Sequence, residues 1–399
     1  MATYEQLQRD PVSRVLFNNR ITTMEGLLTL GGHAFIALDT EHGPIKNENS
    51  RALYQVGLAY LSHIPGQLRL GDSIAAHIPN WPPRLDNFIK NHHIESLTLN
   101  INLSKQTRKD IIRYRGGIPN RRPSRLGYER QVDLGDLESA MIEFIQSHNH
   151  NGTKPVLVGF GMAAEWNYLL RTFPQVMSYF MVWMDLRDIA EDITTAIGVI
   201  PSRVSVLQAL GYHWKDIQGS NKYGTADNAA NDAISVLAMT IGFLNPQNQE
   251  KLRFRQKCSR IARHTYNEND FTFGATIQSQ ENQSQEKVLP KTINSSMKLA
   301  RYFFDFMPSS TGLKSAEVAF ITFENESDLD RFMQANNQRL LPAGETLLVR
   351  PIIKGSVVAN GTFKREQRQR LKAIRKAEML EHDYHDIDLS ESYTTMFQE

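Results

Sequence analysis

Short apolar runs alternate with amphipathic stretches over the first two thirds of the chain. Ala34 to Asp39 (AFIALD) is an apolar run that ends in an acidic residue, which is typical of a buried central strand. Tyr54 to Leu61 forms a second such run, and Ser96 to Leu103 alternates apolar with polar residues as a half-buried strand does. Three strands in succession predict an antiparallel meander.

Helical spacing of apolar residues begins after this meander, with short apolar runs between the helices. We expect helices at Asp136–His148, Ala163–Arg171, Val204–Leu210 and Ala226–Phe243, and strands at Lys154–Phe160 and Phe180–Met184. Strands that alternate with helices join a sheet in parallel through helical crossovers. The sequence therefore predicts an α/β fold, a mixed sheet flanked by helices, over residues 30–245, with residues 1–29 as an N-terminal extension.

A second folded region follows a polar stretch. Gln278 to Glu286 (QSQENQSQE) contains nothing that readily enters a core, so we expect a linker over residues 246–290. Beyond it we expect a small domain over residues 291–355, then a basic helix and an acidic tail over residues 356–399. The expected elements are a helix at 297–306, a strand at 318–323, a helix at 326–336 and a strand at 346–352, with a first strand at either 271–277 or 288–289.

Length and composition agree with two globular domains. The chain has 399 residues, and about 150 residues per domain is usual. Hydrophobic residues make up 41% and charged residues 22%, which excludes a wholly disordered or fibrous chain. Cys258 is the single cysteine, so a disulfide scaffold and a thiolate zinc site are excluded. This cysteine usage indicates a reduced intracellular setting, cytoplasmic or nuclear.

The overall charge does not identify a partner. The net charge is +2, from 45 basic and 43 acidic residues, so a polyanionic partner must be argued from local patches. No apolar run approaches the roughly 18 residues of a membrane span. The N-terminus has no apolar core of a secretory signal. We therefore expect no membrane association.

Two carboxylates lie close together at the end of the first predicted strand. Side chains alternate along a strand, so Asp39 and Glu41 face the same way. Carboxylates this close repel one another unless they are protonated or bridged by a cation. A hard divalent ion such as Mg²⁺ or Mn²⁺ takes oxygen ligands and would bridge them. The alternative is a strand-end turn with two solvated acids.

Further acids follow in a recognisable order. Glu165 lies in the first turns of a helix after a strand and a glycine turn, and Asp227 and Asp232 lie in the segment ADNAANDA. This order resembles the DEDD family of 3′–5′ exonucleases, in particular a fungal branch of helicase-associated and quelling-pathway exonuclease-like domains. Its third motif, H-N-A-x-N-D-A, matches here except at the first position. The resemblance spans roughly residues 30 to 245.

The resemblance implies a ribonuclease-H-like fold and a two-metal nuclease. Asp39, Glu41, Glu165 and Asp232 would hold two divalent ions, Mg or Mn, for hydrolysis at the 3′ ends of RNA or single-stranded DNA. Glu165 departs from the usual Asp of the second motif. Asp227 replaces the general-base His, and an Asp with an ordinary pKa of about 3.9 is a weaker base than a His at about 6.5. Two hypotheses remain, an active nuclease and a catalytically decayed fold that serves as an RNA-binding or protein-interaction scaffold among RNA-regulatory proteins.

A basic segment between residues 113 and 130 suits nucleic acid. Arginine binds phosphates with two parallel hydrogen bonds, and aromatic rings stack on unpaired bases. The expected contacts to single-stranded RNA or DNA are Arg113, Arg115, Arg121, Arg122, Arg125 and Tyr128. The alternative is a solubilising surface loop.

The second domain carries a weaker resemblance. Residues 271 to 355 resemble a divergent RNA-recognition motif, which implies a small ferredoxin-like α+β fold. That family's third strand carries the pattern K/R-G-F/Y-G/A-F-V-x-F/Y. Here Phe320 and Phe323 remain, and by alternation they face opposite sides of the sheet, so at least one of them belongs to the core. Binding of RNA and binding of protein both stay open for this domain.

Overall fold

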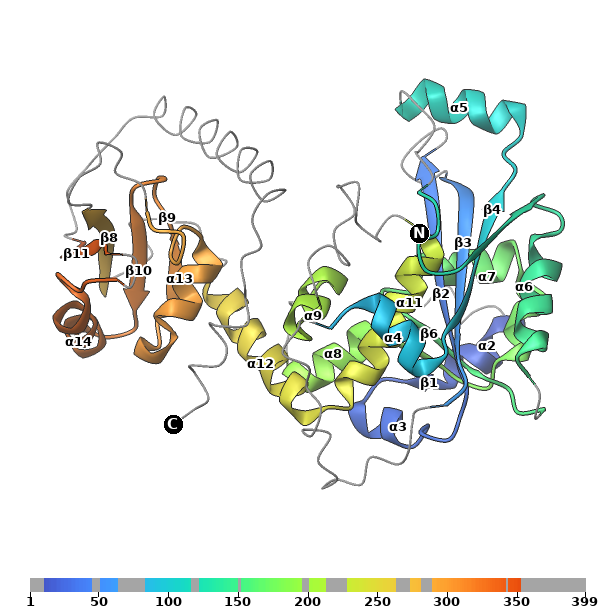
Figure 1. Cartoon of the computed structure of the whole chain (residues 1–399), viewed down its shortest axis with the longest axis horizontal. Coiled ribbons are helices and arrows are strands. Elements are labelled where there is room, and N and C mark those ends of the chain that lie inside the picture. The colour runs from blue at the N-terminus through green and yellow to red at the C-terminus, as the bar shows by residue number, and fades with distance from the viewer. Residues whose placement is uncertain are drawn as a thin grey trace. The chain divides into compact units, whose positions relative to one another are not determined.

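The computed structural model describes residues 11–44, 51–63, 83–115, 122–149, 152–195, 201–212, 228–262, 273–280, 289–341 and 344–352. The chain divides into two compact units, Met1–Arg253 and Phe254–Glu399 (Figure 1). Across the described ranges, no helix combines the length and the apolar composition that a membrane crossing needs.

The first unit is built on a mixed sheet of seven strands in the order β1-β7-β6-β2-β3-β4-β5. The strands are β1 Arg20–Ile21, β2 Phe35–Pro44, β3 Arg51–Leu61, β4 Glu95–Ile101, β5 Tyr128–Val132, β6 Val156–Gly159 and β7 Trp183–Asp185. Strands β2, β3 and β4 form an antiparallel meander. Strand β6 pairs parallel with β2, and β7 pairs parallel with β6. The predicted α/β fold with a mixed sheet is confirmed.

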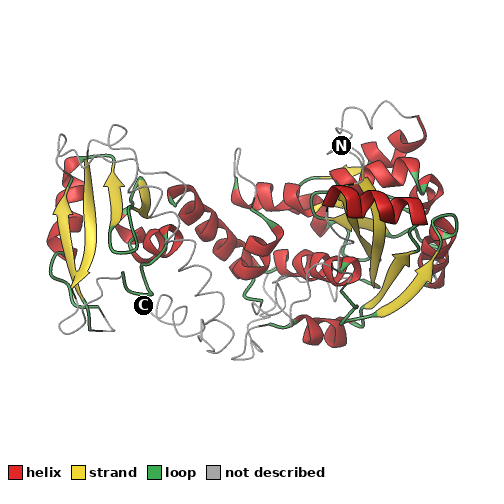
Figure 2. Cartoon of the chain, turned by 90° about the horizontal axis from the view of Figure 1, so that it is seen from above, coloured by secondary structure: helices red, strands yellow, loops and turns green. Residues whose placement is uncertain are grey.

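Helices cover both faces of this sheet (Figures 1 and 2). The helices in this part of the chain are α2 Pro11–Asn18, α3 Met24–Leu28, α4 Leu85–His92, α5 Lys105–Arg115, α6 Leu137–Ser147, α7 Ala163–Arg171, α8 Leu186–Thr194, α9 Arg203–Ala209 and α11 Ala229–Phe243. Helix α12 Pro246–Ile261 crosses the boundary between the two units. Because strand side chains alternate, Phe35 and Ala37 of β2 enter the core under α8, α9 and α11. Ile36 and Leu38 enter the other core, under α2, α6 and α7.

One expected boundary of the first unit is wrong, and the basic segment is only partly a loop. Residues 1–29 are more than an extension, because β1 pairs with β7 and the side chains of Phe17 and Leu27 are buried. The basic segment is more than a loop, since α5 includes Arg113 and Arg115, and β5 begins at Tyr128 and pairs parallel with β4. Neither strand has the apolar alternation that would reveal it, because β1 has two residues and β5 is exposed at four of its five positions.

The second unit is a four-stranded antiparallel sheet in the order β11-β8-β10-β9. Its elements are β8 Phe273–Gln280, α13 Ser296–Tyr302, β9 Ser310–Leu313, β10 Ala319–Phe323, α14 Glu326–Asn336 and β11 Thr346–Pro351. Both helices pack on one face, where Leu299 of α13 and Phe332 of α14 share a core with Ile277 and Ile321. The expected linker over 246–290 is corrected, because α12 and β8 lie within it.

Candidate functional site

Strand β2 carries two of the predicted site residues. Asp39 pairs with Gly57 of β3, and Glu41 pairs with Gln55. The strand continues to Pro44 after an irregularity between Glu41 and His42, so the two acids lie within the strand and not at its end. Asp39 has the same alternation as Phe35 and Ala37, which face α11. Both carboxylates therefore lie on the α11 side of the sheet.

Helix α11 brings a third carboxylate to this face. Asp232 lies in its first turn and is 4% exposed. The helix starts from Asn228, whose side-chain oxygen accepts hydrogen bonds from the Asn231 backbone N–H (3.2 Å) and from the Thr98 hydroxyl (3.1 Å). The Ala229 backbone N–H donates to Gln55 Oε1 at 2.9 Å. These bonds tie the start of α11 to β3 and β4, and thereby set the position of Asp232.

Close packing of helix on sheet depends on a glycine. A Cβ added to Gly57 would lie 2.0 Å from the backbone carbonyl carbon of Ala229. Gly57 is also the partner of Asp39 in the strand register. The absence of a side chain at this position lets the first turn of α11 lie directly on β3, next to Asp39.

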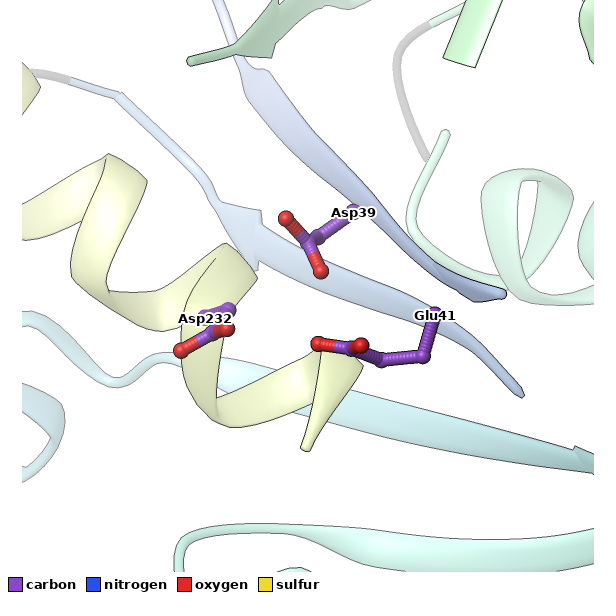
Figure 3. A group of neighbouring side chains, drawn as sticks. All are labelled: Asp39, Glu41 and Asp232. Carbon is purple, nitrogen blue, oxygen red and sulfur yellow. The ribbon is translucent and has the colours of Figure 1, made fainter. Parts of the chain in front are cut away.

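The three carboxylates converge although about 190 residues separate Asp39 and Glu41 from Asp232 in the sequence. Asp39, Glu41 and Asp232 each offer one oxygen, and these oxygens all lie within 4.8 Å of one another (Figure 3). Asp39 and Glu41 are partly exposed, so solvent and ligands reach the cluster from one side. Carboxylate oxygens at this spacing suit a hard divalent cation. The cluster could hold one metal ion, which agrees in part with the predicted cofactor.

An arginine that sequence reasoning missed lies against the cluster. Arg203 is the first residue of α9, and its Nη2 is 2.6 Å from Asp232 Oδ2. Its Nη1 is 3.7 Å from Asp39 Oδ1. Burial alone would lower the pKa of Arg203, but the negative charges of Asp232 and Asp39 outweigh it and raise that pKa. No spacing in the segment PSRVSVLQAL signals this contact, because it arises only when α9 packs beside α11.

The same charges act on Asp39. Burial and then the charge of Asp232 raise the pKa of Asp39 well above its ordinary value, and the guanidinium of Arg203 opposes them. The site therefore carries more negative charge than Arg203 alone offsets, which favours a proton or a further cation at Asp39.

Glu165 lies on the other side of β2. It is in the first turn of α7, is 8% exposed, and accepts a hydrogen bond on Oε1 from the Thr40 hydroxyl at 2.9 Å. Thr40 alternates with Asp39 and Glu41, so it faces α7. Burial raises the pKa of Glu165 to about 7. Among the described residues, the group with metal-ligand spacing contains the other three acids and not Glu165.

The basic segment flanks the start of α11. The Arg122 carbonyl accepts a hydrogen bond from Asn228 Nδ2 at 2.9 Å, and the Arg125 backbone N–H donates to Asn231 Oδ1 at 3.4 Å. Arg125 is exposed, and Tyr128 on β5 is 78% exposed. The turn that carries Asp232 therefore lies beside these arginines.

Other predicted residues are placed less fully. Arg113 is exposed on α5, and Arg115 ends that helix, with its side chain outside the description. Asp227, Arg121 and the tail from residue 353 lie outside the described residues. In the second unit, Phe320 is 1% exposed and Phe323 is 4% exposed, so neither ring is open for stacking on a base.

Comparison with known proteins identifies no relative of this chain. No protein-family model matches the chain, and no curated protein matches it.

Proposed function

We propose that the first unit is a ribonuclease-H-like domain of the DEDD exonuclease type that acts on the 3′ ends of single-stranded RNA or DNA. The order of its sheet supports this, because an antiparallel meander β2-β3-β4 is extended in parallel by β6 and β7 through helices. The positions of the acids that resemble the family's first and third motifs also support it, since Asp39 and Glu41 lie on the first strand of the meander and Asp232 lies in the first turn of α11.

The observation that carries the proposal is the convergence of Asp39, Glu41 and Asp232. Their oxygens lie within 4.8 Å of one another, and Asp39 and Glu41 are partly exposed, so a phosphodiester has access to them. A divalent ion held by these residues would supply Lewis-acid activation of a phosphodiester. The three carboxylates would hold that ion, and without it their negative charge disfavours an anionic substrate.

The basic segment would hold the strand. The backbone of Arg122 and of Arg125 contacts the first turn of α11, which also carries Asp232, and this supports a path for the phosphates toward the cluster. Tyr128 offers an exposed ring on the edge strand β5 for stacking on a base. This placement favours a substrate that is single-stranded, because stacking needs an unpaired base.

The second unit is proposed to be a ferredoxin-like domain related to RNA-recognition motifs. Its strand-helix-strand-strand-helix-strand order supports this. Because Phe320 and Phe323 are both buried, we propose contacts to protein and not stacking on RNA bases for this unit.

One observation favours a second candidate function for the first unit. The Thr40 hydroxyl donates a hydrogen bond to Glu165 on the α7 side of β2, whereas the family resemblance implies that Glu165 shares two ions with the other three acids. An exonuclease fold that has lost catalysis and serves as an RNA-binding or protein-interaction scaffold is therefore the rival proposal.

Cleavage of labelled strands separates the two candidates. The full-length protein is incubated with 5′-labelled single-stranded RNA and DNA in Mg²⁺ and in Mn²⁺, and shortening from the 3′ end is expected. Asp39→Ala and Asp232→Ala should abolish it, because each removes a carboxylate of the cluster, and Asp227→His should raise it by restoring an imidazole base. Asp86→Ala is the control. Asp86 lies in the first turn of α4 with a half-exposed side chain, and this variant should cleave normally. Binding without any cleavage by the wild type or by Asp227→His would establish the scaffold.

A further inference from the structure

Arg203 contacts two of the three clustered carboxylates. Its guanidinium meets Asp232 at 2.6 Å and Asp39 at 3.7 Å, and 24% of its side chain is exposed. Ser202 fixes the residue's place, because its side-chain oxygen accepts from the Ser205 backbone N–H and caps α9. The guanidinium therefore forms an ion pair with one oxygen of each aspartate.

A close cluster of like charges needs a counter-ion. Three carboxylates whose oxygens lie within 4.8 Å repel one another strongly when no cation is present. An arginine stays protonated at any accessible pH, so Arg203 supplies a positive charge that cannot be titrated away. The contacts of Arg203 with Asp39 and Asp232 hold β2 and α11 together at the place where a bridging metal ion would do so.

We propose that Arg203 is the built-in counter-ion of this site, and that a divalent cation binds there only by displacing its guanidinium from Asp39 and Asp232. The inference rests on the metal site of the proposed function and adds to it a residue that sets the site's affinity for the ion. Arg203 keeps the carboxylates together when no metal is bound. It also raises the concentration of divalent ion that is needed to fill the site. A bound cation and the guanidinium compete for the same two carboxylates, Asp39 and Asp232, since two cations this close repel each other.

The test is divalent-ion binding by Arg203→Met, which keeps the length of the side chain and removes its charge. Binding of Mn²⁺ is measured by calorimetry on the full-length protein, and thermal unfolding is followed with and without Mn²⁺. The variant should bind Mn²⁺ between about tenfold and a hundredfold more tightly than the wild type, as expected for removal of one charge at close range. Without Mn²⁺ it should unfold at a lower temperature, and Mn²⁺ should raise that temperature by more than in the wild type.

Arg20→Met is the matched control. Arg20 also pairs with an aspartate, since its Nε donates to Asp188 at 2.9 Å, and its side chain is 25% exposed. It lies on β1 at the edge of the sheet, away from the three acids. This variant should lose stability without any change in Mn²⁺ affinity.

Two further variants keep the test decisive if Arg203→Met does not fold. Arg203→Lys retains the charge with fewer contacts and should bind Mn²⁺ with intermediate affinity. Arg203→Met combined with Asp232→Asn removes one charge of each sign and should fold again. Failure of this double variant to fold, or an unchanged Mn²⁺ affinity in Arg203→Lys, would overturn the proposal.

Cleavage assays distinguish this inference from the proposed function. Metal-dependent cleavage by the wild type, with unchanged Mn²⁺ affinity in Arg203→Met, rejects the role of Arg203 and retains the nuclease. Tighter Mn²⁺ binding in the variant, with no cleavage by either protein, retains the counter-ion and rejects the nuclease. Absence of Mn²⁺ binding in both proteins rejects both.

Discussion

At the scale of single residues, neighbouring positions on β2 have opposite surroundings. Asp39 and Glu41 face α11 and share a cluster with Asp232, whereas Thr40 faces α7 and binds Glu165. Burial is the largest influence on the pKa of both Asp39 and Glu165, but only Asp39 has a guanidinium nearby among its main influences. The two acids should therefore respond differently to pH and to added cations.

Glu165→Gln should stabilise the protein at high pH and not at low pH. Burial raises the pKa of Glu165 from 4.5 to about 7, so the folded state binds a proton that the unfolded state has released between these values. The stability that the protonated acid contributes is complete below pH 4.5 and is lost as the pH rises through about 7. A glutamine keeps the oxygen that accepts from Thr40 and does not ionise.

Urea unfolding checks this prediction. At about pH 8 the variant should be more stable than the wild type by on the order of 3 kcal/mol, and the difference should shrink toward zero at about pH 4. Glu143→Gln, on a side chain that is 67% exposed, is the control and should show little pH dependence of this kind. An equal gain in stability at both pH values would contradict the raised pKa.

At the scale of elements, the site depends on how closely α11 approaches the meander. Thirteen of its fifteen residues are buried, so the helix has no solvent-exposed face. Its position therefore depends on the contacts at its start. Those contacts are the side chains of Gln55 and Thr98 and the bare backbone at Gly57. A substitution at one of these contacts should displace Asp232 although it replaces none of the acids.

Gly57→Ala should displace the start of α11. The added methyl would lie 2.0 Å from the Ala229 carbonyl carbon, which belongs to backbone and cannot rotate away. We expect a loss of stability of about 1–3 kcal/mol or more, together with weaker binding of Mn²⁺. Gly135→Ala is the control, because its Cβ would meet nothing within 4 Å. Wild-type Mn²⁺ affinity in Gly57→Ala, measured by calorimetry, would show that the approach of α11 does not set the site.

At the scale of the whole molecule, the basic segment and the carboxylate cluster both lie within the first unit. The boundary between the units falls inside α12, after Arg253, so the basic segment and all four predicted metal ligands belong to one compact body. Binding of single strands should therefore depend on the first unit, through a few arginines and not through the net charge of +2.

Replacing Arg122 and Arg125 by alanine should weaken binding to single strands and flatten its salt dependence. Each lost phosphate contact reduces the slope of log K against log salt by about 0.7 for single strands. The matched control replaces Lys154 and Arg171, two exposed cations outside the basic segment, of which Lys154 precedes β6 and Arg171 ends α7. An unchanged slope in the Arg122 and Arg125 variant, measured by fluorescence anisotropy, would refute this footprint.

Much of the fold can be predicted because apolar periodicity depends only on local sequence. The meander strands, α7 and α11 are long enough for several apolar residues to repeat on one face, and the predicted ranges meet the observed ones within a few residues. Alternation along a strand is equally local, and it is sufficient to predict that Asp39 and Glu41 face the same side of β2. The motif around Asp232 predicted the third member of the cluster.

Tertiary structure decided what depends on packing between distant segments. Strand β1 has two residues, too few for a pattern, and exists only because β7 offers it hydrogen-bonding groups. The side that Glu165 faces is set by the position of α7 across the sheet, so its place in the order of acids along the chain did not bring it to the cluster. Arg203 meets Asp39 and Asp232 because α9 packs beside α11. Sequence alone determines which face of an element is apolar, whereas the charges that meet at a site follow from which elements pack together.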